Sequence, residues 1–250
     1  MICAVVVAGG TGSRMQAPLK KQFLELDGLP IVSHTLMALD RCPVLERLIL
    51  VVPQQDLAWC RSDILAPLSL VCEVQLVAGG PRRQESVANG LAAVGADDGI
   101  VMIHDGVRPF VRLSLITACL AGVQATGACI PVIPATDTLK QVGPNGVIVQ
   151  TLDRGAIRLA QTPQTFFIGL IRRAHQSALQ RGFDATDDAS VVEFAGGTVT
   201  VVPGDPENIK ITTPQDLLTA RSILHRRREI CASDTGRTAC DSGRQRTLTG

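Results

Sequence analysis

The chain has 250 residues, of which 46% are hydrophobic and 19% charged, and its formal net charge is +1. This length and apolar content suffice for one sizeable core, and a near-neutral chain is not typical of a nucleic-acid-binding protein. No apolar run reaches transmembrane length and the N-terminus enters a strand directly, so we expect a cytoplasmic protein without signal peptide or membrane contact. The eight cysteines form no Cys-x-x-Cys pair, which favours reduced, mostly buried thiols over zinc or disulfides.

The first candidate site is a glycine-rich turn. An apolar run over residues 2–7 is typical of a buried strand, and residues 8–13 that follow it contain Gly9, Gly10 and Gly12. Backbone N–H groups at such a strand end can point at an anion, and glycines let the main chain approach it closely. Arg14 and Lys21 add two positive charges. The simplest ligand for this arrangement is a polyphosphate.

Two well-known phosphate-binding loops do not fit this turn. A P-loop fails because Met15 stands five places after Gly10, where a second glycine is required. A dinucleotide-binding fingerprint fails because Met15 also replaces its third glycine, and the second strand runs into Pro53 and Gln54 without the expected acid. An ordinary strand-to-helix glycine turn remains the alternative, and the basic pair favours a functional site.

The rest of the chain alternates between strand and helix patterns. Apolar runs predict strands over 2–7, 48–52, 70–77, 100–103, 128–133 and 198–202, and helical spacing predicts helices over 30–39, 56–65, 86–94, 113–123, 168–180 and 214–225. This alternation predicts an α/β fold whose mostly parallel sheet is covered by helices on both faces. Three unusual loops, at Gly9, Gly79 and Asp105, all follow strands. We therefore expect them to share one rim of the sheet, where ligands bind in such folds.

Two segments depart from the alternation. Residues 136–142 and 147–152 flank Gly143-Pro144-Asn145-Gly146, which predicts a protruding β-hairpin arm over about 134–160. Residues 229–250 are rich in Arg, Ser, Thr and Gly, so we expect a disordered tail after a folded domain spanning 1–228. Thr186, Asp187 and Asp188 predict the N-terminal cap of a helix.

Six motifs in one order resemble a known family. They are Ala8-Gly9-Gly10-x-Gly12-x-Arg14-Met15, Lys21-Gln22-Phe23, Asp105-x-x-Arg108-Pro109-Phe110, Thr162-Pro163-Gln164-x-Phe166, Thr186-Asp187-Asp188-Ala189-Ser190 and Asn208-Ile209-Lys210-Ile211-Thr212. Together they closely resemble the 2-C-methyl-D-erythritol 4-phosphate cytidylyltransferases of the non-mevalonate isoprenoid pathway, over roughly residues 1–226. Pro81 departs from the pattern, because many relatives carry an acid there.

The resemblance implies a Rossmann-like nucleotidyltransferase fold and a homodimer formed through the arm. It also implies transfer of CMP from CTP to 2-C-methyl-D-erythritol 4-phosphate, with Mg²⁺, giving 4-diphosphocytidyl-2-C-methyl-D-erythritol and pyrophosphate. The nucleophile is a phosphate monoester, which is mostly ionised at neutral pH, so the reaction needs cations and a metal rather than a strong base. The alternatives are a ribitol 5-phosphate cytidylyltransferase and a non-catalytic nucleotide-binding protein of the same fold.

Residue roles follow from the matching motifs. By resemblance, Arg14 and Lys21 stabilise the transition state at the α-phosphate, while Arg154 and Lys210 position the acceptor phosphate. The implied nucleotide-binding residues are Ala8, Gly9, Gly10, Gly12, Ser13, Gly80, Ser86 and Gly106. The implied acceptor-binding residues are Asp105, Arg108, Thr138, Thr162 and Thr186, and Asp105 is also the candidate metal ligand. Structural roles remain open for Asp105 and Thr186 as helix caps and for Arg108 as an ion-pair partner.

Overall fold

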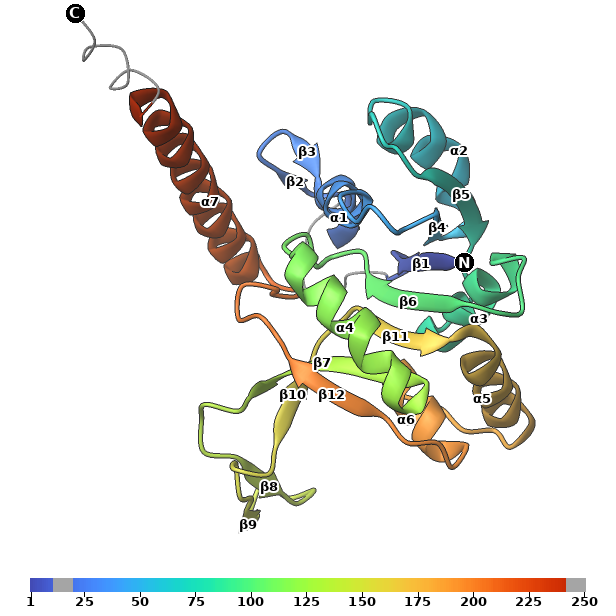
Figure 1. The fold of residues 1–250 in the computed structure, drawn as a ribbon. Coiled ribbons are helices and arrows are strands. Elements are labelled where there is room, and N and C mark those ends of the chain that lie inside the picture. The colour runs from blue at the N-terminus through green and yellow to red at the C-terminus, as the bar shows by residue number, and fades with distance from the viewer. Residues whose placement is uncertain (11–19, 242–250) are drawn as a thin grey trace, which may run out of the picture.

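The computed structural model describes residues 1–10 and 20–241 of the chain, and a central sheet organises them (Figure 1). Its strands run in the order β10-β7-β11-β6-β1-β4-β5, and β12 pairs with β7. Their bounds are β1 Ile2–Val7, β4 Arg47–Val52, β5 Glu73–Ala78, β6 Ile100–Asp105, β7 Ala128–Pro134, β10 Arg158–Ala160, β11 Gln164–Phe167 and β12 Thr200–Pro203. The pairs β1–β4, β1–β6, β4–β5 and β7–β12 are parallel, so the predicted mostly parallel sheet is confirmed.

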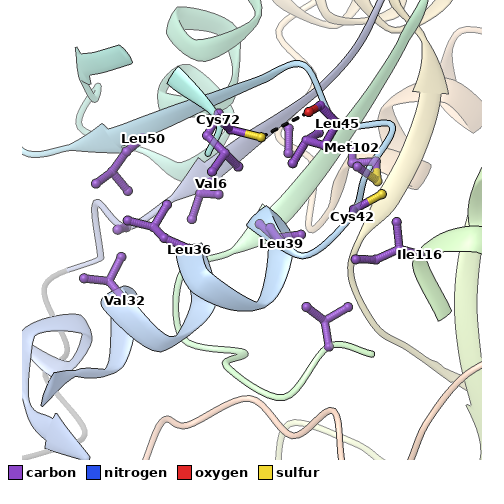
Figure 2. Close-up of a cluster of buried hydrophobic side chains, with 14 of the residues drawn as sticks. Val6, Val32, Leu36, Leu39, Cys42, Leu45, Leu50, Cys72, Met102 and Ile116 are labelled. Carbon is purple, nitrogen blue, oxygen red and sulfur yellow. Dashed lines mark hydrogen bonds between the residues drawn. The ribbon is translucent and has the colours of Figure 1, made fainter. Parts of the chain in front are cut away.

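Helices cover both faces of this sheet, as predicted. Their bounds are α1 Ile31–Asp40, α2 Leu57–Trp59, α3 Arg83–Ala93, α4 Leu113–Thr126, α5 Ile168–Gln180, α6 Asp188–Phe194 and α7 Pro214–Asp241. One core layer joins the strands to α1 and α4, and the other joins them to α3, α5 and α6. In Figure 2, Val32, Leu36 and Leu39 of α1 point toward Val6 and Leu50 of the sheet. Their spacing of four and three residues is the one that places side chains on one helix face.

The structure differs from the predicted elements in several places. The helix predicted over 56–65 consists of the short α2 followed by a π-helical turn, Cys60–Leu65. The strand predicted over 70–77 begins at Glu73, because the Asp40 carboxylate accepts hydrogen bonds from the backbone N–H groups of Val71 and Cys72. Strand β11 was not predicted: it lies antiparallel between β6 and β7 and is only four residues long. The short antiparallel pair of β2 (Glu25–Leu26) and β3 (Leu29–Pro30) was also not predicted. Such short segments carry too little periodicity to be recognised.

The predicted arm is present as an antiparallel pair, β8 (Lys140–Val142) and β9 (Ile148–Thr151). It projects from the end of β7, away from the body of the molecule (Figure 1). The chain then returns to the main sheet through β10, which pairs with β7. The last residues assigned to the arm, 158–160, therefore belong to the central sheet. Most arm residues are exposed.

Helix α7 is longer than predicted. It continues to Asp241 instead of ending at residue 225. The disordered tail from residue 229 stays a prediction, and residues 242–250 lie outside the described residues. Extension costs little once a helix has started, since each added residue gains one backbone hydrogen bond. A small cluster that includes Leu26, Phe110, Ile211 and Ile223 attaches the start of α7 to the body. In the part of the chain that the structure describes, no helix has the length and apolarity needed to cross a membrane.

Candidate active site

The three loops predicted to share one rim do so. A cavity of about 320 Å³ lies at the carboxyl ends of β1, β5 and β6. Its lining contains eight of the predicted site residues, which are Ala8, Gly9, Gly10, Lys21, Gly80, Ser86, Asp105 and Lys210. Close packing joins the loops: the Gly106 N–H donates to the Val7 carbonyl at 2.9 Å, and a Cβ on Gly106 would stand 3.0 Å from the Ala8 Cβ. Parallel strands bring these loops together because their carboxyl ends meet at one edge.

Lys21 reaches the glycine turn through a short 3₁₀ turn, Lys21–Phe23. The buried Gln22 side chain donates to the Ala8 carbonyl at 2.6 Å and ties this turn to the end of β1. The Lys21 Nζ then lies 3.8 Å from the position that a Cβ on Gly10 would take. Lys20 points elsewhere and pairs with Asp56. Of the two adjacent lysines, only Lys21 lines the cavity.

The loop after β5 is held by Ser86. The Gly80 N–H donates to the Ser86 Oγ at 3.1 Å, and this hydroxyl lies within 3.2 Å of the Gly80 and Arg82 carbonyls. A Cβ on Gly80 would stand only 2.5 Å from the Glu85 Cβ, so no other residue fits this turn without rearrangement. Helix α3 begins directly afterwards at Arg83, and its N-terminus favours an anion at this side of the cavity.

Asp105 is the centre of the charged groups. Its carboxylate lies 2.9 Å from the Lys210 Nζ, 3.6 Å from the Arg83 Nε and 3.5 Å from the Arg108 Nε. Burial by itself opposes ionisation, but Lys210, Arg83 and Arg108 outweigh it and hold the pKa of Asp105 well below its usual range. Asp105 is therefore ionised at neutral pH, and its carboxylate holds cationic groups at the cavity wall.

Sequence reasoning missed Arg82 and Arg83, which both line the cavity. Arg83 is paired with the buried Asp188 at 2.7 Å, and Arg82 with Glu85 at 2.6 Å. With Lys21 and Lys210, they give the described lining four cations against the single carboxylate of Asp105. The sequence shows two adjacent arginines between a glycine turn and a helix start, but this signal does not by itself tell whether the pair faces a cavity or solvent.

The remaining predicted residues either do not line this cavity or fall outside the described residues. Gly12, Ser13 and Arg14 belong to the second group. Arg108, Thr162 and Gly106 lie behind the wall and are not part of the lining. Thr138 and Arg154 are exposed on the arm, and Arg154 donates to the Thr136 carbonyl at 2.8 Å. Thr186 is exposed and is not the helix cap, because Asp187 accepts the hydrogen bond from the Ser190 N–H at 2.9 Å.

A buried hydrogen-bond network supports Asp105 from behind. The Asp105 N–H donates to the Thr162 Oγ1 at 3.1 Å, and that oxygen lies 2.9 Å from the His104 Nδ1. The His104 Nε2 lies 3.1 Å from the Arg108 carbonyl. Burial lowers the pKa of His104 to about 4, so its imidazole is neutral at pH 7.

Comparison with known proteins shows the family of the chain. Residues 2–226 match the model of the family described as 2-C-methyl-D-erythritol 4-phosphate cytidylyltransferase. The chain belongs to this family. A relative of that name from Syntrophus aciditrophicus (strain SB) is 46% identical over 223 residues, covering 89% of this chain and 95% of the relative. Membership therefore extends over the sheet, the cavity and the arm.

Solved structures give the same assignment. The 4-diphosphocytidyl-2C-methyl-D-erythritol synthase of Anaerococcus prevotii DSM 20548 is 30% identical, with a TM-score of 0.78, over 90% of this chain and 98% of that one. The 2-C-methyl-D-erythritol 4-phosphate cytidylyltransferase of Thermus thermophilus is 32% identical, with a TM-score of 0.71, over 88% and 98%. The family identifies the chain as an enzyme, a nucleotidyltransferase, with the predicted Rossmann-like fold.

Proposed function

We propose that the chain transfers CMP from CTP to 2-C-methyl-D-erythritol 4-phosphate and releases pyrophosphate. One observation carries the chemistry: four cationic side chains line a single cavity with one carboxylate, beside the glycine turn after β1. Such a cavity suits a polyphosphate. Family membership supports the choice of CTP and of the acceptor.

In this reaction an oxygen of the acceptor phosphate forms a bond to the α-phosphorus of CTP. The bond from that phosphorus to the bridging oxygen breaks, and pyrophosphate leaves with the electron pair. The attacking oxygen is already ionised at neutral pH, so no group need remove a proton. The main barrier is the approach of two anions, and fixed cations lower it where negative charge develops.

We assign Lys21 to the α-phosphate, because it lines the cavity against Gly10 of the glycine turn after β1. Arg14 is proposed for the same role from its motif. Lys210, held by Asp105 at 2.9 Å, is proposed to bind the acceptor phosphate. The backbone of residues 8–10 and the Gly80 turn would hold the nucleotide, and Gly106 and Ser86 would maintain these loops. Arg82 and Arg83 extend the proposed phosphate-binding surface.

Magnesium is proposed as the metal cofactor. Among the described residues, no cluster of three or more His, Cys, Asp or Glu side chains could hold an ion, and Asp105 is the one carboxylate in the described cavity lining. This donor set fits Mg²⁺, which is commonly bound through one or two carboxylates together with substrate phosphates. When bound, the metal would neutralise phosphate charge.

We also propose a homodimer in which Arg154 and Thr138 act in the partner's site. Both residues lie on the arm, outside the cavity of their own chain. Val147, Ile148 and Val149 of the arm are 59%, 57% and 65% exposed, and an exposed apolar edge favours pairing with another chain. Thr162 and Thr186 would complete the acceptor pocket, with Arg108 behind it. Six described cysteines are free and buried, which supports a reducing, cytoplasmic location.

The test is pyrophosphate release with CTP and Mg²⁺, comparing 2-C-methyl-D-erythritol 4-phosphate with ribitol 5-phosphate. We expect turnover that depends on the metal, prefers CTP over ATP and UTP, and prefers the methylerythritol acceptor. Preference for ribitol 5-phosphate would assign the sibling activity. Nucleotide binding without turnover on either acceptor would assign a non-catalytic protein.

A further inference from the structure

We propose that His104 is a positioning residue for cytidylyl transfer: its buried imidazole holds the Thr162 hydroxyl so that this oxygen fixes the backbone of Asp105. The inference rests on the proposed function, because it concerns the geometry of that same site. His104 does not line the cavity. It would act through two intermediaries, Thr162 and Asp105.

The sheet places His104 and Asp105 on opposite sides. Both belong to β6, and successive side chains of a strand point to opposite faces. Asp105 faces Arg83 of α3, so His104 lies on the side of the sheet covered by α1 and α4. It is completely buried, with 0% exposure. A polar ring in such a position is costly unless its nitrogens have hydrogen-bond partners.

The hydrogen bonds of His104 have only one consistent direction. The Arg108 carbonyl can only accept, so the His104 Nε2 carries the proton and donates to it at 3.1 Å. In a neutral imidazole the Nδ1 is then an acceptor, and the Thr162 hydroxyl donates to it at 2.9 Å. The lone pairs of this hydroxyl remain for the Asp105 N–H, which donates at 3.1 Å. His104 thereby sets the rotation of the Thr162 hydroxyl.

The same residues connect to the loop that carries Lys210. The Arg108 side chain donates to the Asn208 carbonyl at 2.6 Å, and the Asn208 side chain donates to the Thr162 carbonyl at 2.8 Å. His104, Thr162, Asn208 and Arg108 thus form a closed ring of contacts behind the cavity. Lys210 follows Asn208 by two residues and binds the Asp105 carboxylate. Displacing His104 would misplace both the carboxylate and its lysine.

Two substitutions separate the two bonds of His104. His104→Asn keeps an acceptor near the Nδ1 position, for Thr162, and His104→Gln keeps a donor near the Nε2 position, for the Arg108 carbonyl. We expect His104→Gln to lower kcat roughly 10- to 100-fold, since small misplacements of reacting groups cost that much, with KM for CTP little changed. His104→Asn should lose less. A kcat of His104→Gln equal to wild type, or the opposite order of the two variants, would overturn the proposal.

Thr162 supplies the second comparison. Thr162→Val removes the hydroxyl and should lower kcat, whereas Thr162→Ser keeps it and should restore most of the loss. Purely structural packing by the methyl group predicts the reverse. The double variant His104→Gln with Thr162→Val should be no slower than the slower single variant, because both break one chain of contacts. If the kcat losses of the two single variants multiplied in the double variant, the proposal that His104 acts through Thr162 would be refuted.

A remote hydroxyl serves as the control. Thr126 Oγ1 contacts the Ala128 carbonyl at 2.9 Å and the Thr200 hydroxyl at 3.0 Å, away from the cavity. We expect Thr126→Val to lower stability without changing kcat. An equal loss of kcat in this variant would show that destabilisation alone explains the effects at Thr162.

Nitrogen NMR of the imidazole gives a readout that needs no activity. The chain has four histidines, and the signal absent from His104→Asn identifies the ring. We expect the proton on Nε2 and none on Nδ1 at pH 7, and a proton on Nδ1 would contradict the proposal. Inactive wild-type protein would refute the proposed function, whereas active wild type with unaffected His104 variants would refute only this inference.

Discussion

The charged side chains at the cavity contact one another within one chain, whereas those of the arm lie in solvent. Asp105 is only 6% exposed and is surrounded by Lys210, Arg83 and Arg108. Arg154 is exposed on the arm, and its side chain contacts the backbone of the same segment. The difference indicates that the cavity is largely prepared within one chain, and it supports the proposal that the arm acts by contacting a second subunit.

The largest expected effect comes from removing a cation of the cavity. Lys21→Ala should lower kcat on the order of 10²-fold or more, because a charge that acts mainly on the transition state changes kcat rather than KM. Steady-state kinetics with CTP and the acceptor measure it. Lys20→Ala is the matched control: Lys20 pairs with Asp56 outside the cavity, and its loss should leave kcat unchanged. A raised KM with normal kcat in Lys21→Ala would assign Lys21 to simple substrate binding.

The burial of His104 should also affect how the free energy of unfolding depends on pH. His104 binds a proton near pH 6.5 when unfolded and only near pH 4 when folded, because burial lowers its pKa. Between these values the unfolded chain holds more protons, so the stabilisation present above pH 6.5 is lost as the pH falls toward 4. We expect the free energy of unfolding to drop by about 3 kcal/mol from this group between pH 7 and 4.

Urea unfolding of wild type and His104→Gln across this range isolates that contribution. The variant should be less stable than wild type at pH 7. The difference between their free energies of unfolding should become smaller as the pH falls, because Gln does not titrate. Asp105 and Arg108 are the charged groups next to the ring, and both remain in the variant. Parallel curves would mean that His104 titrates normally in the folded protein.

How far the sequence predicts the site depends on what holds each residue. The rim was predictable because Gly9, Gly79 and Asp105 each follow a strand, and parallel topology alone brings such loops together. Arg82 and Arg83 were not, since a basic pair in a sequence does not show whether it faces a cavity or solvent. The network of His104 and Thr162 could not be predicted either. It depends on β11 pairing antiparallel with β6, and a four-residue strand is too short to be recognised from its sequence pattern.

For the arm, the sequence predicts the local structure but not the place where its residues act. Its hairpin was predicted from Gly143-Pro144-Asn145-Gly146, and the turn closes as expected, with the Gly146 N–H donating to the Gly143 carbonyl at 3.0 Å. Where Arg154 acts does not follow from one chain, because its proposed target lies on another subunit. The family resemblance supplied that expectation, and only a dimer experiment can test it.

A mixing experiment therefore examines the arm directly. Lys21→Ala and Arg154→Ala chains, each inactive, are unfolded and refolded together, so that about half of the dimers are mixed. In a mixed dimer, the site with intact Lys21 receives Arg154 of the partner subunit, while the other site lacks both groups. We expect roughly a quarter of wild-type activity to return. A mixture that stays inactive, although mass measurement shows mixed dimers, would place Arg154 in the site of its own chain.

The smallest expected effect concerns the end of α7. Arg112, Arg226 and Arg227 lower the pKa of Glu207 to about 2, and the Arg227 side chain also donates to the Phe110 carbonyl at 3.1 Å. These contacts hold the segment that leads to Lys210, and all of the arginines that make them precede residue 229. Beyond it the helix points away from the body (Figure 1).

Deleting 229–250 should therefore leave kcat unchanged and alter stability by less than about 0.5 kcal/mol, as for surface changes in general. Deleting 226–250 is the matched comparison: it removes two of the three arginines on Glu207, and we expect a destabilisation of roughly 1 kcal/mol, near the upper end for exposed ion pairs, with a measurable loss of kcat. If the two truncations behave alike in thermal unfolding and turnover, the arginines on Glu207 do not position the Lys210 loop. If deletion of 229–250 already lowers activity, the end of α7 has a role in the site.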